Sequence, residues 1–489
     1  MSITKKIAIN TIFLLLGKVS SLLLQIIIVA FLARYLGVSG YGKYAFVFAY
    51  LSFFHILSNL GLNTILVREI SRDKSLAPAL IGHGILIRIF LSVVSFSLAL
   101  LIITVLNYPL DTTKAVYVLS LILLFSAFQT PELIFQVYLK LQYSVLINFG
   151  NRLLILGLIL LAISQHQTLI FIIWMFVISN LVLVVSILIF SRKFVIPKFA
   201  FNPKTLKWIL RESWPVALSA IFITIYFKID TIMLSFMKGD EAVGYYNAAY
   251  AIMTNLILIP AAYATAIFPV ISEYFKSSPD SLVKIFKRSF KYLSSLALPI
   301  VVGGVILSKQ IITFIYGEQF YPSIKAFQIL IFASGIIFIS NLVGTTITAI
   351  NRQKINMWYS LVTVILNILL NLLLIPRWSY LGASIATIIT EGLGCSLGFL
   401  FILRYFKIPF FSKSYLNSVR LLLALGVMAL PIFYLRTIHF IAIIPIAAIC
   451  YVGTLFLLGW FDRIDINLLK QILKFDQGRS SIKNAEEKK

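Results

Sequence analysis

The stretch ARYLGVSGYGKYAFVFAY, residues 33–50, lies between two long apolar runs and has one later counterpart, MKGDEAVGYYNAAY, residues 237–250. Gly37 is followed five residues later by Gly42, and Gly239 is followed five residues later by Gly244. A tyrosine stands two residues further on in both copies. Glycine permits close helix approach and positive φ angles, so the paired motifs predict two similar halves that hinge at these four glycines. Duplicated helical halves are a recurrent plan in membrane transporters.

The composition places the chain in a membrane. Of its 489 residues, 60% are hydrophobic and only 12% are charged, a balance that no soluble domain keeps in solution. Continuous apolar runs of roughly 20 residues indicate about 14 transmembrane helices. Because the runs do not alternate between apolar and polar residues, they favour helices over a β-barrel. The expected fold class is therefore an all-α polytopic membrane protein.

The net charge of +25 follows the expected topology and does not indicate a nucleic-acid partner. Numbered from a cytoplasmic start, the even-numbered loops and both termini hold about 31 of the 42 Lys and Arg residues. Positive charge gathers on the cytoplasmic side of membrane proteins. Both termini and the long connector 191–213 are therefore expected in the cytoplasm, and the number of spans is expected to be even.

The organisation expected from these runs has five parts. They are an N-terminal six-helix lobe (1–193), a cytoplasmic linker (194–213), a C-terminal six-helix lobe (214–406), an extra transmembrane hairpin (407–460) and a cytoplasmic basic tail (461–489). The whole connector 191–213 is interpreted as the link between the two halves, and within it Pro197 and Pro203 precede an amphipathic piece, residues 205–211.

A polar stripe marks the first span. Thr11, Lys18, Ser21 and Gln25 fall within a narrow arc of one helix, and apolar residues occupy the other faces. Lys18 lies about 11 residues, or roughly 16 Å, into the span, further than a lysine stem reaches to the membrane surface. The pattern favours a water-filled cavity or a buried partner for Lys18 over a side chain that extends to the headgroups.

Two further polar residues lie nearer the cytoplasmic side. Arg88 stands about two turns into the third span, so a role in a cavity and contact with lipid headgroups both remain open. Glu132 has Gln129 three residues before it and Gln136 four residues after it. A gate and a structural hydrogen-bond cluster fit Glu132 equally well.

The second half carries deep charges on the seventh and twelfth spans. Lys228 and Asp230 point to opposite sides of one helix and cannot pair with each other. Asp230 shares a face with Tyr226, and a deep carboxylate is a common proton or sodium carrier, so Asp230 is the first candidate for ion coupling. An ion pair with a neighbouring helix is the alternative for Asp230. Glu391 is the second candidate, either lining a cavity or buried and neutral among small residues.

Residue patterns for most other chemistry are missing from the sequence. Gly17 and Lys18 are the nearest approach to a nucleotide-binding loop, but Ile12 replaces its first glycine and Val19 its Ser or Thr. Cys395 and Cys450 have no neighbouring histidines, so no metal site is expected. The chain also lacks the motifs of metalloproteases and hydrolases. We expect no enzyme activity, no nucleotide and no cofactor beyond a coupling proton or sodium ion.

Three stretches resemble the polysaccharide-unit flippases (Wzx type). They are ARYLGVSGYGKYAF (33–46), KIDTIMLSFMKGDEAVGYYNAAY (228–250) and NLLLIPRWSYLGASIATIITEG (371–392). That group is part of a larger exporter superfamily that also holds multidrug and toxin extruders and lipid II flippases. The resemblance implies two pseudo-symmetric six-helix lobes that face each other across a central cavity, plus a C-terminal helix pair. A single lysine, Lys18, replaces the several arginines that lipid II flippases carry on the first span.

The resemblance also implies a function. The chain would move polyprenyl diphosphate-linked oligosaccharides from the cytoplasmic to the periplasmic leaflet of a bacterial inner membrane, for O-antigen or exopolysaccharide biosynthesis. Cations suit the diphosphate, and hydrogen-bond donors suit the sugars. The substrate-binding candidates are Lys18, Arg88 and Lys228 for the diphosphate, and Gln25 and Tyr226 for the sugars. Expected partners are the lipid-linked oligosaccharide, membrane lipids and a polysaccharide polymerase complex.

Two rival functions were weighed. A cation-coupled multidrug exporter of the same superfamily would need a net acidic cavity, whereas the deep charges here balance at three basic and three acidic groups. A polymerase or ligase embedded in the membrane would need a large loop with catalytic residues, and the expected outer loops are short turns. The exporter stays as the alternative function.

Overall fold

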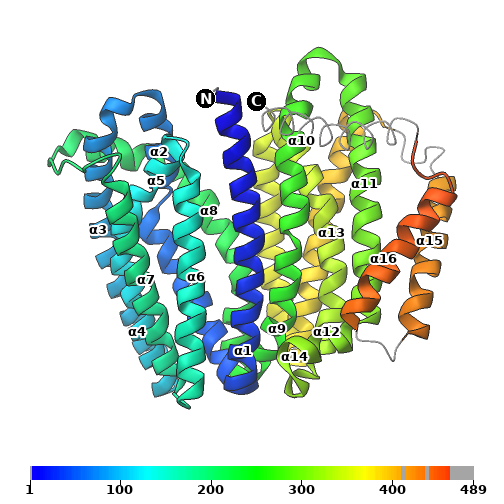
Figure 1. The fold of residues 1–489 in the computed structure, drawn as a ribbon, viewed down its shortest axis with the longest axis horizontal. Helices are drawn as coiled ribbons and strands as arrows, with labels where there is room; N and C mark the ends of the chain where they lie inside the picture. Colours follow the sequence, from blue (N-terminus) through cyan, green and yellow to red (C-terminus); the bar gives the residue numbers. More distant parts are fainter. Residues whose placement is uncertain (1–2, 409–414, 436–439, 463–489) are drawn as a thin grey trace, which may run out of the picture. The chain divides into compact units, whose positions relative to one another are not determined.

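The computed structural model describes residues 3–408, 415–435 and 440–462, without the side chains of residues 3–16, 18 and 415–418. Within these residues the chain is helical and has no strand (Figure 1). The α-helices are α1 (Ile3–Asn59), α2 (Leu62–Arg72), α3 (Ala77–Val105), α4 (Leu110–Ser126), α5 (Leu133–Val137), α6 (Leu141–Ser164), α7 (Leu169–Ser191), α8 (Pro203–Lys238), α9 (Asp240–Leu256), α10 (Leu258–Ser277), α11 (Pro279–Ile306), α12 (Ser308–Tyr316), α13 (Ser323–Ala349), α14 (Gln353–Tyr405), α15 (Tyr415–Tyr434) and α16 (Phe440–Leu457). Three 3-10 turns join them, η1 (Lys74–Leu76), η2 (Ala127–Glu132) and η3 (Glu318–Phe320).

The number of membrane-length segments agrees with the sequence. Eleven helices of the described part are long and apolar enough to cross a membrane. Two of them are double, because α1 breaks at Gly37 and α14 breaks at Ser379. The shorter apolar helix Val419–Tyr434 adds one more segment. Eleven helices, two of them double, and one shorter helix make 14 segments, which confirms the expectation of an all-α membrane protein with about 14 spans.

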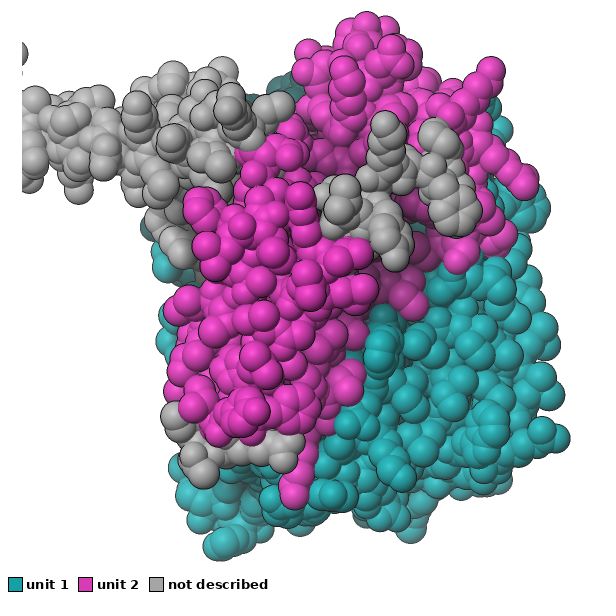
Figure 2. Space-filling view, turned by 90° about the vertical axis from the view of Figure 1, so that its right-hand side faces the viewer, with its two compact units in different colours: residues 1–258, 312–333, 352–394 teal, residues 259–311, 334–351, 395–489 magenta. Residues whose placement is uncertain are grey.

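The chain divides into two compact units, coloured separately in Figure 2. Unit 1 comprises residues 1–258, 312–333 and 352–394, and unit 2 comprises residues 259–311, 334–351 and 395–489. Unit 1 holds all of the expected N-terminal lobe together with α8, α9 and most of α14. The limits of the five parts expected from the sequence stay a prediction.

Within unit 1, the connector after α7 is shorter than the sequence suggested. Asn202 caps α8 by accepting hydrogen bonds from the backbone amides of Lys204, at 3.1 Å, and Thr205, at 3.4 Å. The amphipathic piece 205–211 therefore forms the first turns of the seventh span and is no separate link. Ahead of it, the Lys198 amide donates to the Pro78 carbonyl at 2.8 Å. The connector thus lies against the start of α3.

Within unit 2, the C-terminal hairpin packs on α11. α15 and α16 share an apolar core with the end of α11, built around Met428, Ile443 and Trp460. The Tyr451 hydroxyl donates to the Ser295 carbonyl at 2.7 Å, and Lys291 donates to the Trp460 carbonyl at 2.8 Å. Both bonds tie the hairpin to α11, while the tail beyond residue 462 lies outside the described residues.

Candidate functional site

The two glycine motifs adopt the same backbone conformation. Gly37 has φ 71° and ψ −178°, and Gly239 has φ 79° and ψ −173°. This combination is essentially restricted to glycine, because a Cβ atom would clash with the backbone. The repeat seen in the sequence is therefore also a repeat in structure, with each copy turning the chain from one span into the next.

The two copies also pack on each other. A Cβ atom added to Gly42 would lie 1.8 Å from the carbonyl oxygen of Asp240. A Cβ atom added to Gly244 would lie 2.2 Å from the carbonyl oxygen of Val38. The contact is reciprocal, because Gly42 of the first motif lies against the backbone of the second motif and Gly244 of the second lies against the backbone of the first. We call this contact the paired-turn cluster.

Charged and polar side chains hold the paired-turn cluster in place. Lys43 forms an ion pair with Asp111 and lies 4.0 Å from a carboxylate oxygen of Asp240. Arg34 donates from Nε to the Ile315 carbonyl at 3.1 Å, and Gln319 donates back to the Arg34 carbonyl at 3.1 Å. Four parts of the chain that are far apart in sequence, around residues 33–43, 111, 240 and 315–319, are thereby joined at one end of unit 1.

Aromatic contacts close the same end. Tyr108 stacks on Phe46 with ring centroids 4.6 Å apart and donates a hydrogen bond to Ser235 at 3.0 Å. Tyr108 lies between two spans, and burial raises its pKa to about 12. The phenol therefore stays protonated, and the donor is kept, at any physiological pH.

Arg88 and Glu132 line one pocket of about 180 Å³. The side chains around it come from α1, α2, α3, η2, α5 and α6 and are His55, Asn59, Asn63, Arg88, Gln129, Glu132, Leu133, Gln136, Leu141 and Ser144. Only 2% of Arg88 is exposed, so it does not extend to the headgroups. One of its terminal nitrogens lies 3.3 Å from the Thr130 hydroxyl and 3.5 Å from Asn63 Oδ1, and its buried Nε has no partner among the described residues.

Glu132 belongs to a hydrogen-bond cluster. Its Oε1 accepts from the Ser144 hydroxyl and, at 3.1 Å, from the Asn148 amide. Gln129 and Gln136, which flank it in sequence, line the same pocket. The geometry agrees with the hydrogen-bond interpretation of Glu132, and its role as a gate stays a prediction.

Gln25 lies in a second pocket, which shares Ser144 and thus adjoins the first. Ser21 and Gln25 line it, as the polar stripe on the first span predicts. The Lys18 side chain lies outside the described part of the structure. Gln25 accepts a hydrogen bond from Arg152 of α6.

Asp230 is buried among neutral donors. Its Oδ2 accepts from the Tyr246 hydroxyl at 2.7 Å and from the Thr387 hydroxyl at 3.0 Å, and its Oδ1 accepts from Asn371 at 2.5 Å. Only 2% of Asp230 is exposed. No ion pair of the described residues includes Asp230, and its partners there are neutral, so the alternative of a basic partner on a neighbouring helix gains no support.

Tyr226 and Glu391 form a second hydrogen-bonded link between α8 and α14, beside the link that Asp230 makes to Asn371 and Thr387. The Tyr226 hydroxyl donates to Glu391 Oε1 at 2.6 Å. Tyr226 precedes Asp230 by one turn of α8, and Glu391 follows Thr387 by one turn of α14. The Asp230 bonds and the Tyr226–Glu391 bond therefore connect the same two helices. Three of the predicted site residues thus share one region. Lys228, on the other side of α8, is half-buried and has no hydrogen bond or ion pair with any described residue.

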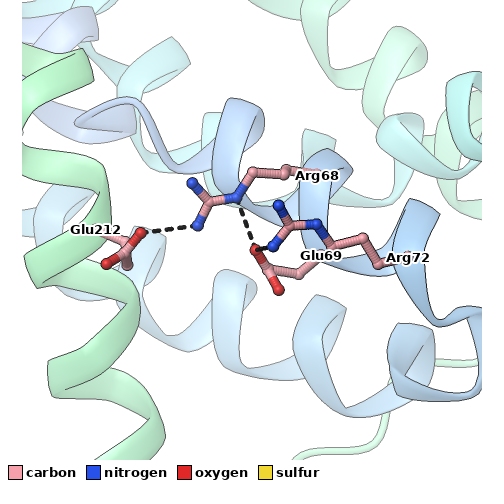
Figure 3. Close-up of polar contacts among 4 residues, drawn as sticks. All are labelled: Arg68, Glu69, Arg72 and Glu212. Atoms are coloured by element: carbon pink, nitrogen blue, oxygen red, sulfur yellow. Dashed lines mark hydrogen bonds and ion pairs between the residues drawn. The ribbon is translucent and has the colours of Figure 1, made fainter.

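A further ion cluster joins α2 to α8, as Figure 3 shows. Arg68 donates to Glu212 of α8 at 2.8 Å and to Glu69 at 2.7 Å. Arg72 donates to the same Glu69 oxygen at 3.2 Å. This ion cluster therefore connects α2 to α8.

Sequence reasoning missed the residues that complete these sites. Arg152 was overlooked because its span was noted only as an apolar run, although an arginine in mid-span is the same signal that selected Arg88. Tyr246, Asn371 and Thr387 come from two other helices, and a sequence alone does not bring them to Asp230. No group of three or more His, Cys, Asp or Glu residues in the described part could hold a metal ion.

Comparison with known proteins decides the family. The model of the family described as "Polysaccharide biosynthesis protein" matches residues 7–275, more than half of the chain. The chain belongs to this family. The MatE family model also matches, over residues 215–373.

Relatives of this family member come from archaea and bacteria. The probable low-salt glycan biosynthesis flippase Agl15 of Haloferax volcanii is 24% identical over 397 residues, which cover 79% of this chain and 81% of that protein. The putative O-antigen transporter of Escherichia coli K12 is 24% identical over 407 residues, 80% of this chain and 96% of that protein. The probable flippase AglR of Haloferax volcanii is 29% identical over 176 residues, and the match spans only 37% of its length.

Solved transporters share the fold of this family member. The lipid II flippase MurJ in an inward closed conformation superimposes with a TM-score of 0.72 at 18% identity, covering 91% of this chain and 98% of that one. An inward-facing multidrug resistance MATE transporter superimposes with a TM-score of 0.66 at 15% identity, covering 79% and 94%. The expected exporter-superfamily fold is confirmed.

Proposed function

We propose that the chain is a flippase that moves polyprenyl diphosphate-linked oligosaccharides across a membrane for polysaccharide biosynthesis. The family match over residues 7–275 carries this proposal, because it joins the chain to polysaccharide biosynthesis. Relatives named as a glycan biosynthesis flippase and an O-antigen transporter, each matched over about four fifths of this chain, support it. Such relatives are transporters, so the chain is assigned no enzyme activity.

The deep cations suit an anionic cargo. Arg88 lines a polar pocket with its Nε unpaired, and Lys228 lies ten residues before the end of α8 without a partner among the described residues. Neither cation forms an ion pair with a described residue, and a deep cation without an ion pair suits a ligand that supplies the opposite charge. We assign Arg88, Lys228 and Lys18 to the diphosphate, and Gln25 to the sugar hydroxyls. Tyr226 is assigned to the sugars only when its bond to Glu391 opens.

The Asp230 cluster is assigned to energy coupling. A carboxylate surrounded by two hydroxyls and an amide offers oxygen and proton-accepting groups, which suit a sodium ion or a proton. Glu391, which accepts a hydrogen bond from Tyr226 one helical turn away, is the second carboxylate of this region. Binding of an ion at Asp230 would change the bonds that join α8, α9 and α14, and would thereby bias their packing.

We infer that the paired-turn cluster acts as the hinge and the outer closure, with Gly37, Gly42, Gly239 and Gly244 as its pivots. The loop charges support cytoplasmic termini, and we assign the chain to a bacterial inner membrane. On that topology Glu132 lies towards the cytoplasmic side and is assigned to the gate there. A polysaccharide polymerase is the further partner that the proposed pathway needs, beside membrane lipids.

The second candidate is a cation-coupled multidrug exporter. The MatE family match over residues 215–373 and the MATE superposition favour it. Exporters of cationic drugs need an acidic cavity, whereas the pocket around Arg88 holds one arginine and one glutamate.

Ligand-induced stabilisation separates the two candidates. A ligand that binds only the folded protein raises its Tm. We expect farnesyl diphosphate-linked N-acetylglucosamine to raise the Tm of the purified protein in detergent, and tetraphenylphosphonium, a lipophilic cation, to leave it unchanged. A rise with the cation alone would favour the exporter and contradict the flippase.

A further inference from the structure

The second pocket, at α1, α6, α9 and the start of α10, contains Gln25 beside several polar residues that have no assigned role. It has a volume of about 480 Å³, within the usual range for small-molecule sites. It is lined by Gly17, Ser21, Leu22, Gln25, Ser144, Val145, Asn148, Arg152, Thr254, Asn255 and Leu258. Six of these side chains are uncharged hydroxyls or amides, one is a cation, and none is acidic. Such a lining suits a hydroxylated ligand that carries negative charge.

The polar groups form two facing rows. Ser144, Asn148 and Arg152 are spaced by four residues on α6 and therefore lie in line along one face. Ser21 and Gln25 form the matching row on α1, which lies beside α6 (Figure 1). A Cβ atom at Gly17 would lie 2.5 Å from Val145 Cγ1, so the two helices pack closely at one end and enclose the pocket there.

Arg152 cannot place its charge in water at the membrane surface. It is the twelfth residue of α6, and 11 residues, or about 16 Å, separate it from the first residue, Leu141. The distance to the other end of the helix is similar. An arginine side chain does not span that distance, so its guanidinium stays at mid-membrane depth.

The charge of Arg152 is also uncompensated. Its recorded partner is the neutral Gln25 Oε1, and no carboxylate of the described residues forms an ion pair with it. A guanidinium has five N–H donors, of which this bond uses one. Glu132, the carboxylate that contacts this row of α6 side chains, accepts hydrogen bonds from Ser144 and Asn148 and none from Arg152. Four donors are left for a ligand.

We propose that this pocket is a saccharide subsite in which Arg152 binds an anionic oxygen group of the cargo. The guanidinium fork matches two oxygens of a phosphate or a carboxylate, while Ser21, Asn148 and Asn255 bind hydroxyl groups. The inference rests on the proposed flippase function and deepens it. The anionic oxygens come either from the carrier diphosphate or from an acidic sugar.

The test uses a cysteine as a reporter of occupancy. Leu258→Cys, at an apolar position of the pocket lining, is introduced into the full chain after Cys395 and Cys450 are replaced by serine, and the protein is reconstituted in nanodiscs. Protection from a methanethiosulfonate reagent is then titrated with three probes, farnesyl diphosphate, octyl glucuronide and the uncharged octyl glucoside. We expect protection by an anionic probe at concentrations at least about tenfold below those of octyl glucoside.

The Arg152 variants show whether the guanidinium is responsible. Arg152→Gln should raise the protecting concentration at least about tenfold, and Arg152→Lys should raise it less, because lysine keeps the charge but not the fork. Arg192→Gln, an exposed arginine after α7, is the matched control and should change nothing. Protection by farnesyl diphosphate alone identifies the diphosphate as the source, and protection by octyl glucuronide alone identifies an acidic sugar.

Equal protection in the parent and in Arg152→Gln, or protection by none of the probes, would overturn the subsite. Transport of farnesyl diphosphate-linked N-acetylglucosamine, measured with the same proteins in vesicles, distinguishes failure of the subsite proposal from failure of the proposed flippase function. Transport that persists at an unchanged apparent affinity in Arg152→Gln removes only the subsite. Absence of transport by the unaltered chain counts against the flippase itself.

Discussion

Gly42 lies against the backbone of Gly244. A Cβ atom at Gly42 would come within 3.0 Å of the Gly244 amide nitrogen and within 1.8 Å of the Asp240 carbonyl oxygen. Each glycine is the second of its motif, and each occupies the same place relative to the other copy. The internal repeat is therefore a contact surface as well as a duplicated turn, and α1 and α9 meet through it without intervening side chains.

Adding one methyl group at either glycine should force the two turns apart. We expect Gly42→Ala and Gly244→Ala each to lower the stability of the folded protein by about 1–3 kcal/mol, as overpacked contacts do. Transport should fall in both variants. Gly157→Ala is the control, because a Cβ atom there would meet nothing within 4 Å. Thermal unfolding of purified variants measures the effect, and wild-type stability of Gly42→Ala would contradict the packing.

The neutral donors around Asp230 lead to a second prediction. Asp230→Asn should abolish gradient-driven transport while the protein still inserts and folds, because the amide carries no charge to exchange for a proton or sodium ion. Tyr246→Phe removes one hydrogen bond to the carboxylate and should reduce transport less. Tyr117→Phe, whose hydroxyl contacts Thr104 away from this cluster, is the control phenol. Full gradient-driven transport by Asp230→Asn would rule out the carrier role.

Arg88 should matter for cargo affinity more than for folding. We expect Arg88→Gln to raise the apparent KM for lipid-linked saccharide about tenfold or more, the loss expected for one charge-assisted hydrogen bond to a phosphate. Arg88→Lys should keep part of that affinity. The measurement is the concentration dependence of transport in vesicles. An unchanged KM with a lowered Tm would indicate that Arg88 only joins α3 to its neighbours.

Lys18 is predicted to face water, because Ser21 and Gln25 of the same stripe line the pocket of α1 and α6. Cysteine at position 18, in a chain lacking Cys395 and Cys450, should react with a membrane-impermeant thiol reagent. Leu23, which is 55% exposed on the outer face of α1, supplies the control, since its cysteine would lie in lipid and stay unreactive. The reverse pattern of reactivity would show that the stripe points elsewhere.

The sequence predicted those features that depend on residues close together in the chain. Apolar runs gave the spans, and the glycine spacing gave two turns with one backbone conformation. Periodicity also placed Ser21 and Gln25 on one face of the first span, and flanking glutamines associated Glu132 with a polar cluster. Each of these follows from the 3.6-residue repeat or from the special conformations of glycine.

Features that depend on contacts between distant helices were not predictable. Asp230 is satisfied by Tyr246 of α9 and by Asn371 and Thr387 of α14, and a sequence does not show which helices are neighbours. The sequence therefore left Asp230 without a named partner. The sequence suggested a connector up to residue 213, but the Asn202 cap starts α8 at Pro203, so residues 205–211 belong to that helix.

The transport of a lipid-linked saccharide is best tested in reconstituted vesicles. Fluorescently labelled farnesyl diphosphate-linked N-acetylglucosamine is incorporated into both leaflets, and dithionite added outside quenches the label that it can reach. Vesicles with the unaltered chain and an imposed proton or sodium gradient should lose more than the outer-leaflet half of the signal, whereas protein-free vesicles and Asp230→Asn vesicles should stop near half. Quenching that stops at half with the unaltered chain, while the same vesicles transport ethidium, would contradict the flippase and favour a multidrug exporter.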